Sequence, residues 1–194
     1  MAAGRQWVLL TLKSEGQWEE TMKKSMLGLL VLALTTYFAA QFPAPVFAGP
    51  AEDVKAAMQL LESKAAALGA PRVKGEEAVA GKTVPALYFG DTEMNNNFVL
   101  VDEIQKEKGG TATIFVKSGD EFVRVATNVK KDDGSRAIGT ALDPKGKAIA
   151  AIAKGKSFFG EVSILGKPYI AGYEPIRDAS NNVIGVYYVG YKKV

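Results

Sequence analysis

The sequence predicts an α+β fold, built on an antiparallel β-sheet with helices mainly in the first half of the domain. Helix-like apolar spacing occurs early, over residues 50–68 and 98–106, and strand hairpins follow over residues 111–128 and 166–191. Helices that come first, followed by strands that pair with their neighbours along the chain, are typical of α+β domains. Neither an internal repeat nor an interdomain linker interrupts this pattern, so we expect one domain over residues 49–194.

A long N-terminal helix is predicted over residues 50–68. Pro50 suits its first turn, and Gly69 with Pro71 ends it. Apolar residues recur along it at helical intervals and form one stripe. The stripe consists of Val54, Met58, Leu61, Ala65 and Leu68. It either packs on its own domain or forms a dimer seam, and packing is favoured because about two heptads are too few for an independent coiled coil.

Shorter elements are predicted after this helix. Residues 72–84 are polar and contain glycine, which predicts a loop. Apolar and β-branched runs beyond that loop predict short strands and helices. These are a strand over 85–89, a helix over 98–106, a hairpin with strands over 111–116 and 121–128, a helix over 144–154 and a strand over 160–165.

The C-terminal hairpin, residues 166–191, has the clearest strand pattern in the chain. Tyr169, Ala171 and Tyr173 alternate on one face of its first strand. Aromatic and β-branched residues favour a half-buried pleated surface, and they alternate on the second strand as well. One face of that strand is predicted to carry Val183, Gly185, Tyr187, Val189 and Tyr191. The polar run between the strands is rich in Asp, Asn and Ser, which supply turn chemistry.

The N-terminal residues predict a targeting segment. From Met22 the chain has the layout of a secretory signal, with Lys23 and Lys24, an apolar stretch, and cleavage expected after Ala48. Residues 1–21 fit neither the signal nor the domain, and we expect them to be a spurious extension. An uncleaved membrane anchor is the alternative. The apolar run has about 16 residues, fewer than the roughly 20 that a spanning helix needs, so a cleaved signal and a periplasmic or secreted protein are favoured.

The composition excludes several classes of site. The chain contains no cysteine and no histidine, which removes thiol nucleophiles, disulfides, Cys/His zinc sites and the usual general base near neutral pH. The formal net charge of +3 is too small to indicate a nucleic-acid surface. No phosphate loop, dinucleotide fingerprint or calcium loop occurs in a suitable context. We therefore expect no metal, no cofactor and no enzymatic activity.

Charged and phenolic side chains on the predicted strands are the candidate ligand contacts. Arg124 interrupts an apolar strand, and a lone buried guanidinium is costly unless it pairs or meets a ligand. Arg136 stands in a glycine-containing loop, and Lys167, Tyr169 and Tyr173 lie along one strand. Such groups offer charge-assisted, directional hydrogen bonds, which suit a small carboxylate in an apolar pocket. The alternatives are structural: salt bridges for the arginines, and core packing with satisfied hydroxyls for the tyrosines.

Six stretches of the domain carry a family pattern: TATIFV, FVRVATNV, GSRAIGT, FFGE, GKPYIAGYEPI and VIGVYYVG. They resemble the single Cache sensor domains of the Cache 3/Cache 2 fusion type, which occur outside the cytoplasm in bacterial chemoreceptors and sensor kinases. The resemblance implies a PAS-like antiparallel sheet with a long N-terminal helix, short flanking helices and a pocket for organic acids or amino-acid-like ligands. The pocket strands would carry Phe115, Arg124, Thr127, Lys167, Tyr169 and Tyr173, with Arg136 in the loop over them.

The chain departs from the receptor pattern at its C-terminus. The sequence ends at Val194, and we expect the protein to lack the second transmembrane helix, HAMP segment and output domain of such receptors. We therefore expect a free module that binds a small organic acid, takes part in signal transduction and passes its signal to a partner. The alternative is a structural or interaction protein that binds no ligand and pairs through its N-terminal helix with itself, a sensor kinase or a chemoreceptor.

Overall fold

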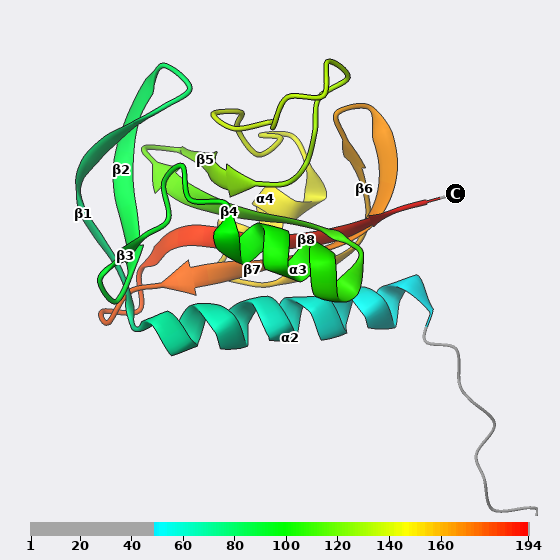
Figure 1. Ribbon diagram of the computed structural model, residues 1–194, viewed down its shortest axis with the longest axis horizontal. Coiled ribbons are helices and arrows are strands. Elements are labelled where there is room, and N and C mark those ends of the chain that lie inside the picture. The colour runs from blue at the N-terminus through cyan, green and yellow to red at the C-terminus, as the bar shows by residue number, and fades with distance from the viewer. Residues whose placement is uncertain (1–48, 194) are drawn as a thin grey trace, which may run out of the picture. The chain divides into compact units, whose positions relative to one another are not determined.

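The computed structural model describes residues 49–193, which lie in one compact unit. The predicted extension and signal segment, residues 1–21 and 22–48, lie outside the described residues. Two antiparallel sheets form the framework, one of five strands in the order β5-β4-β8-β7-β6 and one of three in the order β1-β2-β3 (Figure 1). The elements are α2 (Pro50–Leu68), β1 (Pro71–Val79), β2 (Lys82–Phe89), β3 (Thr92–Glu93), α3 (Val99–Lys108), β4 (Thr111–Ser118), β5 (Glu121–Thr127), α4 (Lys147–Ile152), β6 (Phe158–Ile164), β7 (Lys167–Arg177) and β8 (Val183–Lys192). The predicted α+β fold with a long N-terminal helix is confirmed.

The five-stranded sheet has a core on each face. Helices α2 and α3 cover one face, where Tyr187 and Val189 of β8 point, and α4 lies on the other (Figure 1). Tyr188 of β8 pairs in register with Tyr173 of β7, so these two rings share the α4 face. Of the alternating set predicted for β8, Tyr187, Val189 and Tyr191 pack in the core on the α2 and α3 face. Val183 packs with the opposite core, so the prediction is wrong for this residue, which lies at the register shift between Ile176 and Arg177.

The long helix buries its apolar stripe within the domain. Val54, Met58, Leu61 and Ala65 are each buried, whereas Leu68 at the end of the stripe is 41% exposed. The helix lies against β7 and β8, and Lys64 forms ion pairs with Glu103 and Glu107 of α3. The stripe is thus used for packing inside the domain.

The predicted loop over residues 72–84 is wrong. These residues form most of β1 and the start of β2, and the two strands pair antiparallel, with Pro71 opposite Phe89 and Val79 opposite Lys82. Most of β1 is exposed, so it lacks the alternation of apolar residues from which a strand is predicted. A register shift between Val73 and Glu76 contains Gly75, whose φ of 74° is one that glycine adopts without steric cost.

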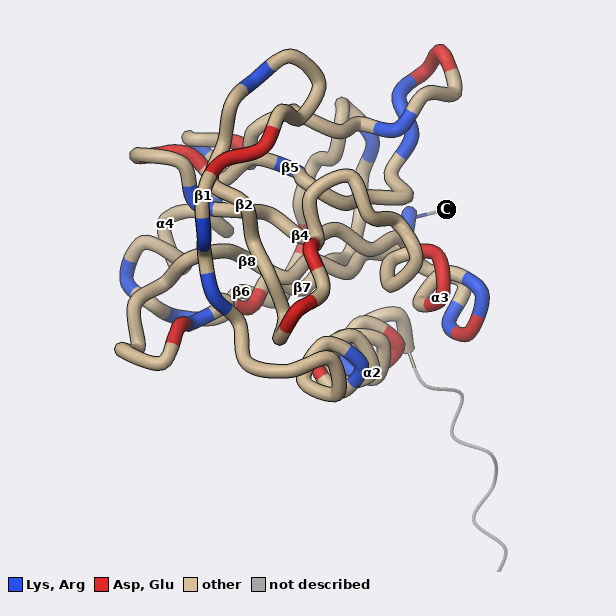
Figure 2. The backbone as a smooth tube through the Cα atoms, turned by 60° about the vertical axis from the view of Figure 1, so that its left-hand side comes forward, with Lys and Arg blue, Asp and Glu red and all other residues tan. Residues whose placement is uncertain are grey.

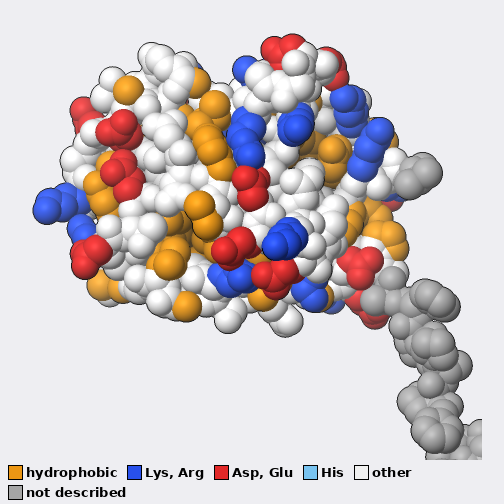
Figure 3. Space-filling view, viewed as in Figure 1, with side chains coloured by type: hydrophobic (Ala, Val, Ile, Leu, Met, Phe, Trp, Pro, Cys, Tyr) orange, Lys and Arg blue, Asp and Glu red, His pale blue; other side chains and the backbone are white. Residues whose placement is uncertain are grey.

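Charged residues of both signs are distributed over the surface. Lys and Arg occur along the chain together with Asp and Glu (Figure 2), and the two signs are interspersed on the face that carries α2 and α3 (Figure 3). This distribution agrees with the small net charge, and on the face that Figure 3 shows the basic residues of the described part of the chain form no extended patch of the kind that nucleic acid binds. Within residues 49–193, no helix combines the length and the apolar character needed to cross a membrane.

Candidate functional site

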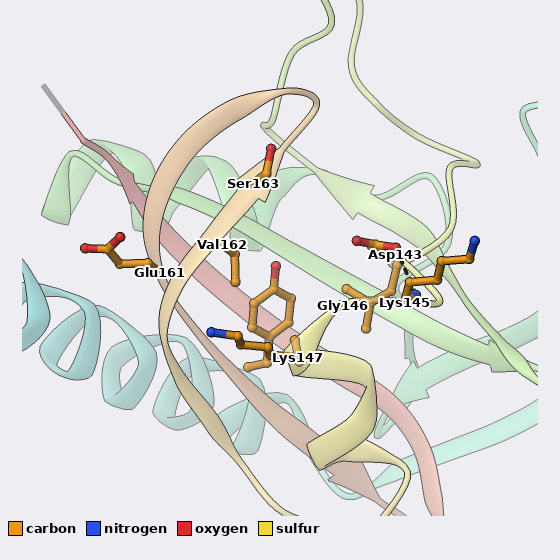
Figure 4. A pocket seen from close by; sticks show the side chains of 10 residues that line it. Asp143, Lys145, Gly146, Lys147, Glu161, Val162 and Ser163 are labelled. Atoms are coloured by element: carbon orange, nitrogen blue, oxygen red, sulfur yellow. Dashed lines mark hydrogen bonds between the residues drawn. The ribbon is translucent and has the colours of Figure 1, made fainter.

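A pocket of about 240 Å³ opens on the α4 face of the five-stranded sheet. Asp143 and Lys145 of the loop before α4 form one wall, and Glu161, Val162 and Ser163 of β6 form the other (Figure 4). The complete lining is Leu142, Asp143, Lys145, Gly146, Lys147, Ala148, Glu161, Val162, Ser163 and Tyr173. Both charge signs therefore surround the mouth, while the interior is largely apolar.

Tyr173 brings a phenol to the inner end of this pocket. Its ring is only 2% exposed and lies 5.0 Å from the ring of Tyr188, with Phe158 on its other side at 6.3 Å. Burial raises the pKa of Tyr173, so its hydroxyl stays neutral and able to donate a hydrogen bond. The Tyr188 hydroxyl lies 3.1 Å from the Thr111 hydroxyl, which fixes the second ring.

Arg124 lies deeper in the same half of the domain. It pairs in register with Phe115, and its guanidinium carbon stands 5.0 Å from the centre of the Phe115 ring. The Nη1 group donates a hydrogen bond to Thr140 Oγ1, while the buried Nε–H has no hydrogen-bond partner within residues 49–193. Phenylalanine packing from β4 and a loop hydroxyl thus hold the cation in place without neutralising it.

The charge of Arg124 has no counterion among the described residues. The side chain is 5% exposed, and no carboxylate of residues 49–193 lies within ion-pair distance of it. Burial lowers the pKa of the guanidinium, and the nearby Tyr173 and Tyr188 phenols oppose that shift. A buried cation is normally paired, because moving a charge from water into a protein interior costs on the order of several kcal/mol. Arg124 is therefore suited to meet an anion.

The guanidinium and the open pocket are adjacent but not continuous. Tyr173 and Leu142 line the pocket, whereas Arg124 does not. Leu142 follows two residues after Thr140, the residue that binds Nη1, so one loop segment borders both the pocket and the cation. Tyr173 borders the pocket and also lies close enough to Arg124 for its phenol to act on the pKa of the guanidinium.

The structure places the other predicted contacts elsewhere. Arg136 forms a two-point ion pair with Asp102 of α3, at 2.7 and 2.8 Å. Thr127 is fully buried, and its hydroxyl bonds to that of Thr113 at 2.6 Å. Lys167 is exposed and pairs with Asp132 at 2.7 Å, which raises the pKa of its ammonium group. Tyr169 is half-buried against the same core as Tyr173 but does not line the pocket.

Of the seven residues predicted from the sequence, the structure brings together Phe115, Arg124 and Tyr173. It adds Tyr188 and Thr140, which sequence reasoning missed. The signal for Tyr188 was available, because antiparallel pairing across the turn at 178–182 places it opposite Tyr173. No local signal marks Thr140, whose place depends on how the loop returns to the edge of β5.

The sequence was compared with models of known protein families. The model of the Cache 3/Cache 2 fusion domain matches residues 51–194. The chain belongs to this family. The predicted resemblance is thereby confirmed. A comparison with curated proteins gives no significant match.

Cache domains are extracytoplasmic domains that sense small molecules within sensor proteins, and they are typically not enzymes. The site agrees with this general role, because it offers a small open pocket lined by apolar residues and a few polar groups. In the part of the chain that the structure covers, residues 49–193, no three Asp or Glu side chains gather where they would hold a metal ion.

Proposed function

We propose that this Cache domain binds a small organic acid, whose carboxylate pairs with Arg124. The buried, uncompensated guanidinium of Arg124 is the observation that carries this proposal. A carboxylate would supply the missing counterion and accept a hydrogen bond from Nε–H, which has no partner within residues 49–193. Guanidinium and carboxylate groups match each other in planar, two-point geometry, and such pairs are among the strongest hydrogen bonds in proteins.

Tyr173 is proposed to orient the acid. Its neutral hydroxyl donates to the second carboxylate oxygen or to a polar substituent next to it, while the Phe115 and Tyr188 rings exclude water. For the carboxylate to reach Arg124, the side chain of Tyr173 or Leu142 has to move, a rotamer change of the kind that commonly accompanies binding.

The pocket volume restricts the size of the acid. About 240 Å³ is below the range of roughly 300–1,000 Å³ that drug-sized ligands occupy. The proposal therefore favours acids of few carbon atoms, and acetate, propionate, L-lactate and pyruvate are suitable probes. Each has a neutral amide of nearly the same shape, which serves as its matched control.

The test compares each acid with its amide by thermal unfolding of the purified full chain. An acid present at about 100 times its Kd stabilises the folded state by about 2.7 kcal/mol. For a domain of about 150 residues this corresponds to a rise in Tm of roughly 5–10 °C. We expect at least one acid to raise Tm and its amide to leave Tm unchanged. Equal shifts for acid and amide, or no shift with any acid, would contradict the proposal.

Substitutions separate Arg124 from the cations at the mouth. Arg124→Met should abolish the shift in Tm that the acid produces, because the variant lacks the cation that pairs with the carboxylate. Lys147→Met should leave the shift nearly intact, since Lys147 is exposed and its charge is screened by solvent. If Lys147→Met abolished binding and Arg124→Met did not, the carboxylate would bind at the mouth instead of at Arg124.

The site of action is proposed to be the periplasm or the cell exterior, with residues 22–48 acting as the export signal. N-terminal sequencing of the exported protein tests this, and a start other than Gly49 would correct the boundary. The alternative of an interaction protein that pairs through α2 receives little support, because the apolar stripe of α2 is buried apart from Leu68. Sedimentation of the full chain without ligand tests that alternative independently.

A further inference from the structure

The ion pair between Arg136 and Asp102 joins α3 to the loop that follows β5. The guanidinium donates to both carboxylate oxygens, at 2.7 and 2.8 Å, and to the Thr127 carbonyl oxygen at 2.8 Å. Its carbon also stands 4.5 Å from the centre of the Phe98 ring. The two side chains are only partly exposed, at 31% and 43%. Arg136 is therefore held by three partners and fixes its loop relative to α3.

The same loop runs directly from Arg136 to the partner of Arg124. Ala137 N–H donates to the Val129 carbonyl, and Gly139 N–H donates to the carbonyl of Arg124, both at 2.9 Å. The Arg124 N–H in turn donates to the Thr140 carbonyl at 2.9 Å. Residues 136–140 thus form a short strap along the free edge of β5, with one end on α3 and the other on Arg124.

Thr140 links the strap to the guanidinium of Arg124 through its hydroxyl group. Its hydroxyl donates to the Ala137 carbonyl at 2.7 Å, so its lone pair is left to accept the hydrogen bond from Arg124 Nη1. The orientation of that lone pair depends on where the Ala137 carbonyl lies, and Ala137 follows Arg136 in the chain. A shift of Arg136 would therefore be passed on to Arg124 through one carbonyl and one hydroxyl.

We infer that Arg136 and Asp102 form a positioning pair that sets the geometry of Arg124 and thereby the affinity for the carboxylate. This inference rests on the proposed function of Arg124. Neither residue contacts the ligand in this proposal. Because Asp102 belongs to α3, this helix would couple the position of Arg124 to the face of the domain formed by α2 and α3. Lys64 of α2 already contacts the neighbouring Glu103 at 2.9 Å.

The chain offers a matched control for Arg136. Arg72 pairs with Asp91 at 3.1 Å, donates to the Gly90 carbonyl at 3.0 Å and stands 4.9 Å from the centre of the Tyr88 ring. It thus repeats the same three kinds of contact, an ion pair, a backbone carbonyl and an aromatic ring, on the small sheet and outside the strap. Arg136→Met and Arg72→Met thus remove the same kinds of interaction in two places, the Arg72 pair being the more exposed.

The experiment uses whichever of the four probe acids wild type binds most tightly and measures its affinity for each full-chain variant. The temperature is one at which urea unfolding shows every variant to be folded. We expect Arg136→Met to weaken binding by roughly five- to tenfold, the lower part of the range for coupled sites, and Arg136→Lys to recover part of the loss. Arg72→Met should bind as wild type does. Equal affinity for Arg136→Met and wild type, or an equal loss for Arg72→Met, would overturn the inference.

A second readout needs no ligand. The Arg124 Nε–Hε signal in the spectrum of isotope-labelled protein, assigned by its absence in Arg124→Met, reports the environment of the guanidinium. We expect this signal to shift or broaden in Arg136→Met and to stay in place in Arg72→Met. An unchanged signal in Arg136→Met would overturn the positioning role. Failure of wild type to bind any acid, with the signal shifted as expected, would instead count against the proposed function and leave the positioning of Arg124 supported.

Discussion

Replacing Arg124 by methionine should separate the stability of the domain from its function. Methionine is unbranched and flexible, and it fills the space of the arginine stem without bringing a charge. The guanidinium is 5% exposed and has no counterion within residues 49–193. We therefore expect the free protein to be no less stable with methionine at this position, although a buried side chain is being changed.

The magnitude follows from the contacts of Arg124. Burying the uncompensated charge costs on the order of several kcal/mol, and the unpaired Nε–H adds about 1–3 kcal/mol. Against this stand the hydrogen bond to Thr140, about 1.5–3 kcal/mol for a charged donor, and the contact with the Phe115 ring, about 1–2 kcal/mol. The Thr140 hydroxyl keeps its bond to the Ala137 carbonyl in the variant. Replacing a buried ion by an apolar side chain is often neutral or stabilising by about 1–4 kcal/mol, so the free energy of unfolding should stay the same or rise within that range.

Urea unfolding without ligand, followed by far-ultraviolet circular dichroism, measures this change. Arg136→Met serves as the matched control, because it removes a paired arginine and leaves Asp102 without its partner. We expect the control to lose about 1 kcal/mol, the upper end for a partly exposed ion pair. A loss of more than about 2 kcal/mol in Arg124→Met, comparable with large-to-small core substitutions, would refute the view that the charge of Arg124 is uncompensated.

Three further predictions concern single residues. Tyr173→Phe removes the hydroxyl at the inner end of the pocket and keeps the ring, so affinity for the acid should fall roughly tenfold while stability changes by less than about 1 kcal/mol, as titration calorimetry and urea unfolding would show. Gly185→Ala would place a methyl group against the backbone carbonyl of Phe115 and should cost about 1–3 kcal/mol in urea unfolding; an unchanged midpoint would contradict this packing. Burial, and secondly the charge of Glu174, raise the pKa of Glu62 above 4.5. The folded protein therefore holds this proton more tightly than the unfolded chain, and its free energy of unfolding falls as the pH rises from 4.5 through the raised pKa. Glu62→Gln should therefore be more stable than wild type at neutral pH and equal to it below pH 4.5, and a constant difference across both conditions would rule out the raised pKa.

The elements that bury one face were predictable from the sequence. The stripe of the helix over 50–68 repeats at helical spacing, and the hairpins carry alternating apolar residues with turn residues between them. Strand β1 was not predictable in this way. It is held by backbone pairing with β2 while most of its side chains remain in solvent, and backbone pairing leaves no pattern in side-chain type.

The site was predictable only in part, because it depends on the order of the strands. Arg124 was conspicuous as a charge inside an apolar strand, but its proximity to Tyr173 requires β8 to lie between β4 and β7. The partner of Arg136 is Asp102, 34 residues earlier on another element, and no spacing rule connects them. Local chemistry thus identified which residues were unusual, and long-range packing decided which of them share a site.

Arg124 is proposed to receive the carboxylate through its Nε–H, and the resonance of that group reports on this contact. Titration of the isotope-labelled full chain with the acid that raises Tm should shift the Arg124 Nε–Hε signal and slow its exchange with water, because a hydrogen bond forms where the free protein has none within residues 49–193. The matching amide should leave the signal unchanged. An acid that saturates the protein while the Arg124 signal stays in place would contradict the account.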